Sequence, residues 1–291
     1  MSAIRFIIFG DSKGKDYGIN EKILTKILKE SCKLKPLPEF IVMLGDNVAG
    51  SEKEDILHSQ LVRLRTLIKK FHGNILLLPV VGNHEVNIEP IDDRYELIFK
   101  KIYSDMLPTG FLGGYNGTVY YKDFQDTRFI VLNSFHYGAL HKIDDKQLNW
   151  FKNAASAHIK NKLLFVHSPG YPTGAHYSHC LDLYPENRDA FWHIVDSCGI
   201  DIVFSSHEHN YSRRIIDSSF STAQTPYERN VFQIISGGAG EKLRDKYVDK
   251  KGVIVKPIAV YHFLVVDVEA SHIKVCAINY HGKKIDEFSI D

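Results

Sequence analysis

The chain has 291 residues, of which 44% are hydrophobic and 24% charged, a balance typical of a globular protein with a sizeable core. Its 36 basic and 35 acidic residues leave a net charge of +1, which argues against a broad surface for nucleic acid. No apolar stretch reaches the roughly 18 residues of a membrane span, and the run at 4–9 is too short for a signal-peptide core. We therefore expect a cytoplasmic protein without a membrane partner.

Three apolar runs in the first third of the chain predict buried strands. They are IRFIIF at 4–9, EFIVML at 39–44 and ILLLPVV at 75–81, each short and continuously apolar, as in strands covered on both faces. Apolar residues at helical spacing separate them, at 23–28 and again at 57–71, where Ser51 and Glu54 predict a capping box. This β-α-β-α-β order predicts a mostly parallel sheet with right-handed crossovers.

The rest of the chain predicts further strands and two more helices. Residues 118–124 and 128–133 suggest paired strands, and a helix is expected from Asp145 to about residue 158. The apolar run before His167 and the run at 201–205 predict two more strands, with a helix between them that ends at Gly199. From residue 230 onward the pattern is rich in strands, which predicts a second, largely antiparallel sheet. Since no linker or repeat interrupts the chain, we expect one domain spanning 1–291.

Polar side chains suited to chemistry follow five of the predicted strands. Because the carboxyl ends of parallel strands open on one side of a sheet, these side chains are expected to meet in one crevice. The mixture of carboxylate, amide and imidazole groups suits Mn, Fe or Zn, and six ligands are too many for one tetrahedral zinc. The set, in chain order, is Asp11, Asp46, Asn83, His167, His207 and His209.

Each of these signals has a structural alternative when it is taken alone. A single Gly-Asp after a strand is usually a turn or a helix cap, and a lone His-x-His is more often a surface or core pair. The stretch Gly-Asn-His-Glu at 82–85 is harder to explain in this way. The complete series, with every member at the end of a strand, favours a metal centre.

The series Gly-Asp, Gly-Asp, Gly-Asn-His-Glu, His and His-x-His resembles the calcineurin-like metallophosphoesterase superfamily. The flanking segments LLFVHSP, IDIVFSSHEHNYSRR and IISGGAGE resemble its purple-acid-phosphatase-like branch. The similarity extends from Ile4 to about Gly240. It implies a four-layer α/β/β/α sandwich of two mixed sheets, with the C-terminal strands in the second sheet and two metal ions at the edge of the sandwich.

The resemblance also implies a role for each member of the series. Asp11 and His209 would hold the first ion, and Asp46 would bridge the two ions. The second ion would be held by the three remaining residues, Asn83, His167 and His207. A hydroxide bridging the ions would attack the phosphate in line. His84 would stabilise the transition state or protonate the leaving group, the alternative being that it only orients a ligand.

Two departures from the family pattern affect the first ion. Lys13 stands where the superfamily commonly has a histidine ligand, and Ala49 stands where purple acid phosphatases have a tyrosine ligand. A protonated lysine offers no lone pair to a metal, so we expect a weakened first site and no tyrosinate-to-iron colour. Lys13 is predicted to meet a substrate phosphate, or else to be a solvated loop lysine. His176 and Arg213 are the other two predicted substrate-binding residues.

The resulting hypothesis is a phosphoesterase, either a phosphatase or a phosphodiesterase, that acts on a small phosphate monoester or diester. The substrate, the native metal, the occupancy of the first site and the oligomeric state stay open. The alternative is a non-catalytic protein-binding module on a degraded scaffold, against which His84 and the complete second set of ligands argue. A nuclease would be expected to carry a basic stripe, which the near-neutral charge disfavours.

Overall fold

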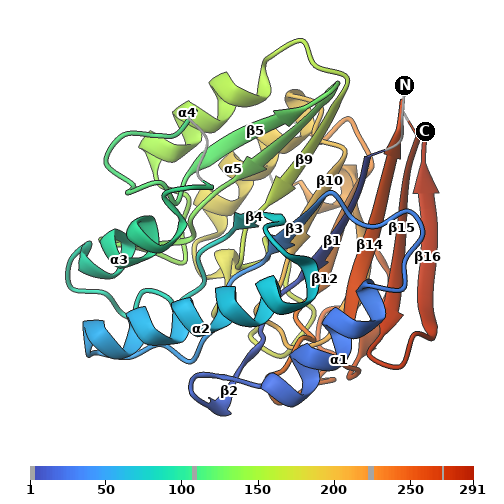
Figure 1. Ribbon diagram of the computed structural model, residues 1–291. Coiled ribbons are helices and arrows are strands. Elements are labelled where there is room, and N and C mark those ends of the chain that lie inside the picture. Colours follow the sequence, from blue (N-terminus) through green and yellow to red (C-terminus); the bar gives the residue numbers. More distant parts are fainter. Residues whose placement is uncertain (1–3, 107–109, 222–225, 271) are drawn as a thin grey trace.

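Two β-sheets stacked face to face form the centre of the molecule, with helices on the outer face of each (Figure 1). This computed structural model describes residues 4–106, 110–221, 226–270 and 272–291. The arrangement confirms the four-layer α/β/β/α sandwich of two mixed sheets that the family resemblance implies.

The first sheet joins the N-terminal strands to the C-terminal ones. Its order is β16 (Lys284–Ile290), β15 (His272–Asn279), β14 (His262–Glu269), β1 (Ile4–Phe9), β3 (Phe40–Met43) and β4 (Leu76–Pro79). β1, β3 and β4 are parallel, as predicted, whereas β14 pairs antiparallel with β1. The expectation that the C-terminal strands belong to the second sheet is therefore wrong for β14, β15 and β16, whereas the strands Val231–Ser236 and Val253–Ile258 do lie in that sheet. Apolar periodicity identifies a strand but does not indicate which edge of which sheet it joins.

The second sheet is mixed rather than largely antiparallel. Its order is β13 (Val253–Ile258), β11 (Tyr211–Ile216), β12 (Val231–Ser236), β10 (Ile202–Ser205), β9 (Asn161–Phe165), β6 (Thr127–Val131) and β5 (Tyr120–Phe124). β12, β10, β9 and β6 run parallel to one another, while β5, β11 and β13 join antiparallel. Three short strands lie outside the two sheets, namely β2 (Lys13–Asp16), β7 (Phe135–His136) and β8 (Ala139–Leu140).

Alternating side chains of the strands fill three apolar layers. On β1, Ile7 and Phe9 pack against the helices, whereas Phe6 and Ile8 face the other sheet. Because both faces are covered, the strand is apolar at almost every position, as its sequence predicts. The helices on the first sheet are α1 (Glu21–Ser31), α2 (Glu54–His72) and α3 (Arg94–Tyr103), and those on the second are α4 (Asp145–Ala155) and α5 (Pro185–Ser197). Short 3-10 turns cover Leu181–Leu183 and Ser218–Phe220.

The start of α2 differs from the predicted capping box. The helix begins at Glu54, and no side chain caps its first turn. The hydroxyl of Ser51 instead accepts a hydrogen bond from the backbone N–H of Lys53 at 3.0 Å, before the helix begins. Glu54 and Asp55 in the first turn still complement the positive end of the helix dipole.

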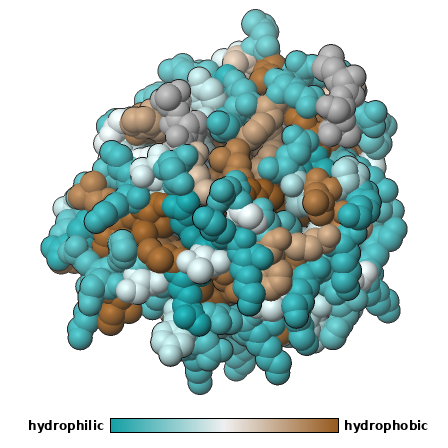
Figure 2. Space-filling view, viewed as in Figure 1, coloured by the Kyte–Doolittle hydropathy of each residue, from teal (hydrophilic) through white to brown (hydrophobic). Residues whose placement is uncertain are grey.

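The outer surface on the side of α2 and α3 is mainly polar. On the face drawn in Figure 2, hydrophilic residues predominate and hydrophobic ones form separate patches. Among the helices of the described residues, none is long and apolar enough to cross a membrane. The four cysteines, which are Cys32, Cys180, Cys198 and Cys276, are all free, in agreement with their scattered positions.

A buried histidine in the first sheet makes the stability of the fold depend on pH. His262 donates from Nδ1 to the carbonyl of Val260 at 2.8 Å and accepts at Nε2 from the Ser236 hydroxyl at 3.0 Å. Burial lowers the pKa of His262 to about 4, because a second ring proton would place a positive charge away from water. That proton would also prevent Nε2 from accepting the hydrogen bond of Ser236. The unfolded chain binds that proton near pH 6.5. Stability is thus full above pH 6.5 and falls as the pH drops from there towards 4.

We expect His262 to account for a loss of about 2 kcal/mol in the free energy of unfolding between pH 7 and pH 5. Chemical denaturation of wild type and His262→Gln at both pH values measures this loss as the difference in their pH dependence. The exposed His281→Gln serves as the control and should keep the wild-type dependence. An unchanged pH dependence in His262→Gln would contradict the assignment.

Candidate metal centre

The predicted ligands converge because the carboxyl ends of both sheets' parallel strands meet at one edge of the sandwich. Asp11 and Asp46 follow β1 and β3, whereas His167 and His207 follow β9 and β10. Several ligand positions adopt the left-handed backbone conformation, with φ of 56° at Asp11, 52° at Asp46, 69° at His207 and 53° at His209. Such a conformation costs about 1–3 kcal/mol for a residue with a side chain. The fold therefore holds these side chains at a local energetic cost, as is common at functional sites.

Two glycines of the sequence motifs make room for the ligands. Gly45 has a φ of 84°, and a Cβ there would lie 2.7 Å from Nδ1 of His167. A Cβ on Gly82 would collide with the carboxylate of Asp46. The glycine before each ligand is thus explained by close approach of the backbone, and not by a loop that cradles phosphate.

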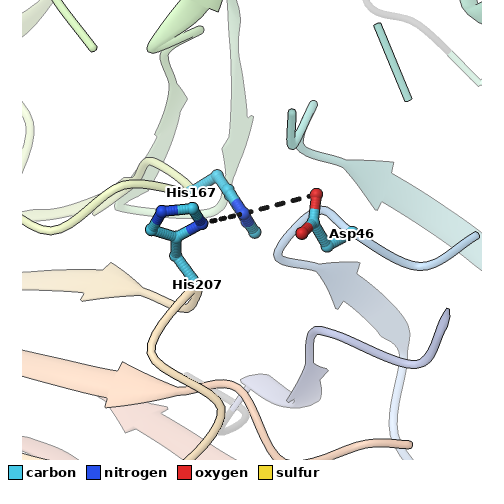
Figure 3. Close-up of side chains that lie close together, drawn as sticks. All are labelled: Asp46, His167 and His207. Atoms are coloured by element: carbon cyan, nitrogen blue, oxygen red, sulfur yellow. Dashed lines mark hydrogen bonds and ion pairs between the residues drawn. The ribbon is translucent and has the colours of Figure 1, made fainter. Parts of the chain in front are cut away.

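Asp46, His167 and His207 form the core of one ligand set, and their side chains point towards one another from different loops (Figure 3). His167 donates from Nδ1 to the carbonyl of Leu44 at 2.7 Å, so Nε2 is the nitrogen that is left to bind a metal once it has lost its proton. That Nε2 lies 3.4 Å from Oδ1 of Asp46 and 3.2 Å from Nδ1 of His207. The side-chain oxygen of Asn83 is buried without a hydrogen-bond partner among the described residues. Two imidazoles, a carboxylate and an orphaned amide oxygen fit a divalent transition metal.

The second set, made of Asp11, Asp46 and His209, already surrounds a cation of the protein itself. The Nζ of Lys13 lies 2.6 Å from Oδ2 of Asp46, 3.6 Å from Oδ1 of Asp11 and 3.3 Å from Nε2 of His209. Lys13 is only 6% exposed. It is therefore not a solvated loop residue, and its ammonium lies among three groups that could together hold a metal ion.

The two carboxylates are strongly biased towards their ionised form. Burial alone would favour protonation, but Lys13 and His167 hold the pKa of Asp46 well below its usual range. His209 and Lys13 likewise hold the pKa of Asp11 below its usual range. In turn, and against the effect of burial, Asp46 raises the pKa of His167 to about 9. Binding of a divalent cation to His167 therefore requires that the ring first loses a proton.

Glu85, which was not predicted as a site residue, ties two of the ligand loops together. Its carboxylate accepts hydrogen bonds from the backbone N–H groups of Asp46 and Gly82, both at 2.8 Å, and of Asn47 at 2.7 Å. It is 1% exposed, and burial together with Asp46 raises its pKa. The sequence shows this glutamate within the Gly-Asn-His-Glu motif, but nothing there indicates that it accepts hydrogen bonds from the backbone instead of binding a metal.

Glu208 plays a similar part for the loop that carries His176. It accepts from the backbone N–H groups of Thr173 at 2.6 Å and Gly174 at 2.8 Å, and from that of His176 at 3.2 Å. The ring of His176 then packs 4.4 Å from that of His207. Burial and the neighbouring His209 lower the pKa of His176 to about 4, so its ring is neutral at pH 7.

A small crevice of about 240 Å³ opens over both ligand sets. His84 faces it, with Nδ1 donating to the carbonyl of Ala49 at 2.7 Å and Nε2 lying 3.9 Å from Oδ2 of Asp46. Arg244, at the exposed rim, was missed because it lies in an irregular segment just beyond the IISGGAGE stretch, where no motif includes it. The residues that line the crevice are Lys13, Asp46, Asn83, His84, His176, His207, His209, Glu241 and Arg244.

Arg213 does not lie with the other predicted site residues. Its Nε donates to Oδ2 of Asp286 at 2.8 Å, and its guanidinium stacks 4.2 Å from the ring centre of Phe288. Asp286 and Phe288 belong to β16, so Arg213 links the two sheets, and its expected role in substrate binding is not supported. Tyr17, the nearest tyrosine in sequence to the first ligand, is 73% exposed and stacks on Arg63.

Comparisons with known proteins agree with this geometry. The sequence model of a protein family described as calcineurin-like phosphoesterase matches residues 4–211. The human (Homo sapiens) serine/threonine-protein phosphatase CPPED1 is 22% identical over 217 residues, which cover 68% of this chain and 62% of that protein. The chain thus spans less than two thirds of the length of the curated relatives it matches.

Solved structures show the same fold at low sequence identity. Purple acid phosphatase PPD1 from yellow lupin (Lupinus luteus) seeds is 14% identical with a TM-score of 0.77, covering 100% of this chain and 54% of that one. GAP50, the anchor in the inner membrane complex of Plasmodium, is 13% identical with a TM-score of 0.65, covering 100% of this chain and 89% of that one. At such identities, the likeness supports the fold only.

Proposed function

Because the chain belongs to the calcineurin-like phosphoesterase family, we propose that it hydrolyses a small phosphate ester with a metal ion held by Asp46, Asn83, His167 and His207. The observation that carries the proposal is this ligand set, in which Asn83 offers a buried oxygen that has no partner among the described residues and His167 directs its Nε2 towards Asp46 and His207. His84 lies beside the set and faces the same crevice.

The residues that line the crevice have different roles in the proposed hydrolysis. An ion in this set supplies Lewis-acid charge to the phosphoryl oxygens and lowers the pKa of a bound water. The hydrogen bond from His84 to Ala49 fixes its ring, so that Nε2 is directed into the crevice and can carry a proton to the leaving group. Lys13 and Arg244 also line the crevice and would contribute positive charge to the phosphate oxygens.

The size and charge of the crevice favour a compact phosphorylated group. Its volume of about 240 Å³ lies below the range of about 300–1,000 Å³ usual for pockets that enclose drug-sized ligands. The proposal covers monoesters and diesters, including a phosphoserine side chain, which the name of the human relative suggests as one substrate to test.

Metal removal gives the direct test of the proposal. After chelation we expect no hydrolysis, and readdition of Mn, Zn, Fe or Mg should restore it with at least one substrate. The panel contains aryl phosphate, bis-aryl phosphate, cyclic nucleotides, nucleotide pyrophosphates and a phosphoserine peptide. His167→Ala should weaken metal binding by more than the roughly 10–100-fold typical for losing a ligand's hydrogen-bond partner. The exposed His158→Ala is the control and should bind metal as wild type does.

A non-catalytic binding module is the second candidate, and the position of Lys13 is the observation that favours it. Lys13 fills one ligand set of the centre, as expected if the scaffold no longer needs two ions. The relative GAP50 is itself described as an anchor. If wild type and His84→Ala were equally inert with every metal and substrate of the panel, this second candidate would replace the first.

A further inference from the structure

The buried ammonium of Lys13 lies among three groups that could otherwise hold a metal ion. The ligating atoms of Asp11, Asp46 and His209 all lie within 4.8 Å of one another. The Nζ of Lys13 contacts each of the three, at 3.6, 2.6 and 3.3 Å respectively. The lysine nitrogen therefore lies where an ion bound to these groups would lie.

A backbone hydrogen bond also fixes the position of Lys13. The N–H of Lys13 donates to the carbonyl of Asp46 at 3.1 Å, which fixes the start of β2 against the loop after β3. Two residues later, Lys15 on the same short strand is exposed. The burial of Lys13 is thus specific to its position and is not a general property of the lysines in this loop.

An ion and this ammonium cannot share the set. Metal ions lie about 2.0–2.2 Å from nitrogen and oxygen ligands, so an ion bound to the three groups would overlap or directly face the lysine nitrogen. Lysine carries its proton at neutral pH, offers no lone pair, and would repel the ion at short range. With the ammonium present, one divalent ion brings the summed charge of Asp11, Asp46, Lys13 and the ion to about +1, whereas two ions would bring it to about +3.

We propose that Lys13 replaces one of the two metal ions typical of this family, so that the protein binds a single ion per chain, in the Asp46–Asn83–His167–His207 set. The ammonium then takes over the charge of the missing ion and faces the substrate phosphate from the opposite side. The stoichiometry does not depend on catalysis, whereas the role towards phosphate rests on the proposed function.

Metal content measured on purified protein tests the stoichiometry. After equilibration with excess Mn(II) and removal of free metal, elemental analysis should give one ion per wild-type chain. Lys13→His restores an imidazole at the position where relatives have a ligand, and should bind two ions per chain, a twofold rise. Lys13→His combined with His209→Ala should return to one ion. Lys15→His is the matched control and should stay at one ion.

Paramagnetic resonance gives a second readout that does not depend on counting. Wild type loaded with Mn(II) should show the spectrum of an isolated ion, whereas Lys13→His should show the exchange-coupled spectrum of a close pair. Circular dichroism verifies that each variant is folded, and Lys13→Gln, which replaces the ammonium with a shorter neutral side chain, provides a second route should the histidine variant fail to fold. Lys13→Gln should also bind more than one ion per chain.

Two outcomes would overturn the inference. One is a wild-type chain that binds two ions, and the other is a Lys13→His and Lys13→Gln pair that both stay at one ion. Neither outcome concerns hydrolysis. A chain that binds one ion but hydrolyses no ester refutes the proposed function alone, and an active chain with two ions refutes this inference alone.

Discussion

Replacing His84 with alanine is expected to lower kcat by about 10²–10⁴-fold, while the bound metal stays unchanged. The reason lies in the position of the ring, which the carbonyl of Ala49 fixes at 2.7 Å and which faces the crevice without belonging to either ligand set. Steady-state kinetics, with metal content measured on the same preparation, separate the loss of a proton donor from the loss of an ion.

The leaving group shows which role His84 has. If His84 donates a proton, the loss should be largest for an alkyl phosphate and much smaller for an activated aryl phosphate, whose leaving group needs no proton. An equal loss for both substrates would instead indicate that His84 stabilises the phosphoryl oxygens. A variant with wild-type kcat on both substrates would show that His84 has no part in the reaction.

Replacing Glu85 with alanine is expected to reduce the free energy of unfolding by about 3 kcal/mol, because the three buried N–H groups closest to its carboxylate lose their acceptor at about 1 kcal/mol or more each. Those groups belong to Asp46, Asn47 and Gly82, so the ligand loops should also lose their relative position. Chemical denaturation measures the first effect and metal affinity the second.

The control for this prediction is Glu52→Ala, which removes an exposed glutamate and should change stability by less than about 0.5 kcal/mol. If Glu85→Ala unfolded like wild type, the carboxylate would not be what holds the two loops together. A loss of stability with unchanged metal affinity would show that the loops keep their geometry without it.

The ligand positions could be predicted because parallel strands place their carboxyl ends at a common edge. Asp11, Asp46 and Asn83 follow strands of the first sheet, and the histidines follow strands of the second, in the order the sequence predicts. Their assignment to particular ions stays a prediction. The predicted sheet was wrong for β14, β15 and β16, because pairing of β14 with β1 joins segments more than 250 residues apart, as in Ile4 with Val268.

What the sequence could not reveal is the direction in which polar side chains point. Arg213 is near the motifs in sequence, yet its partner Asp286 is 73 residues away on another sheet. Glu85 and Glu208 carry carboxylates that could bind a metal, but both accept hydrogen bonds from backbone N–H groups. The departure at Lys13 was visible, but its burial between two carboxylates depends on the tertiary contacts of β2.

Because the predicted metal ligands come from both sheets, the packing between the sheets affects the geometry of the metal centre. Asp46 and Asn83 come from one sheet and His167 and His207 from the other, so the gap between the sheets sets the distances across the site. Aromatic rings fill that gap, since Phe129 of the second sheet meets Phe6 and Phe40 of the first edge-on, with ring centres 5.2 and 5.1 Å away. The size of these rings sets the distance between the sheets. Replacing one of them with a smaller side chain should therefore alter the fit of an ion at the edge, although these rings are not ligands.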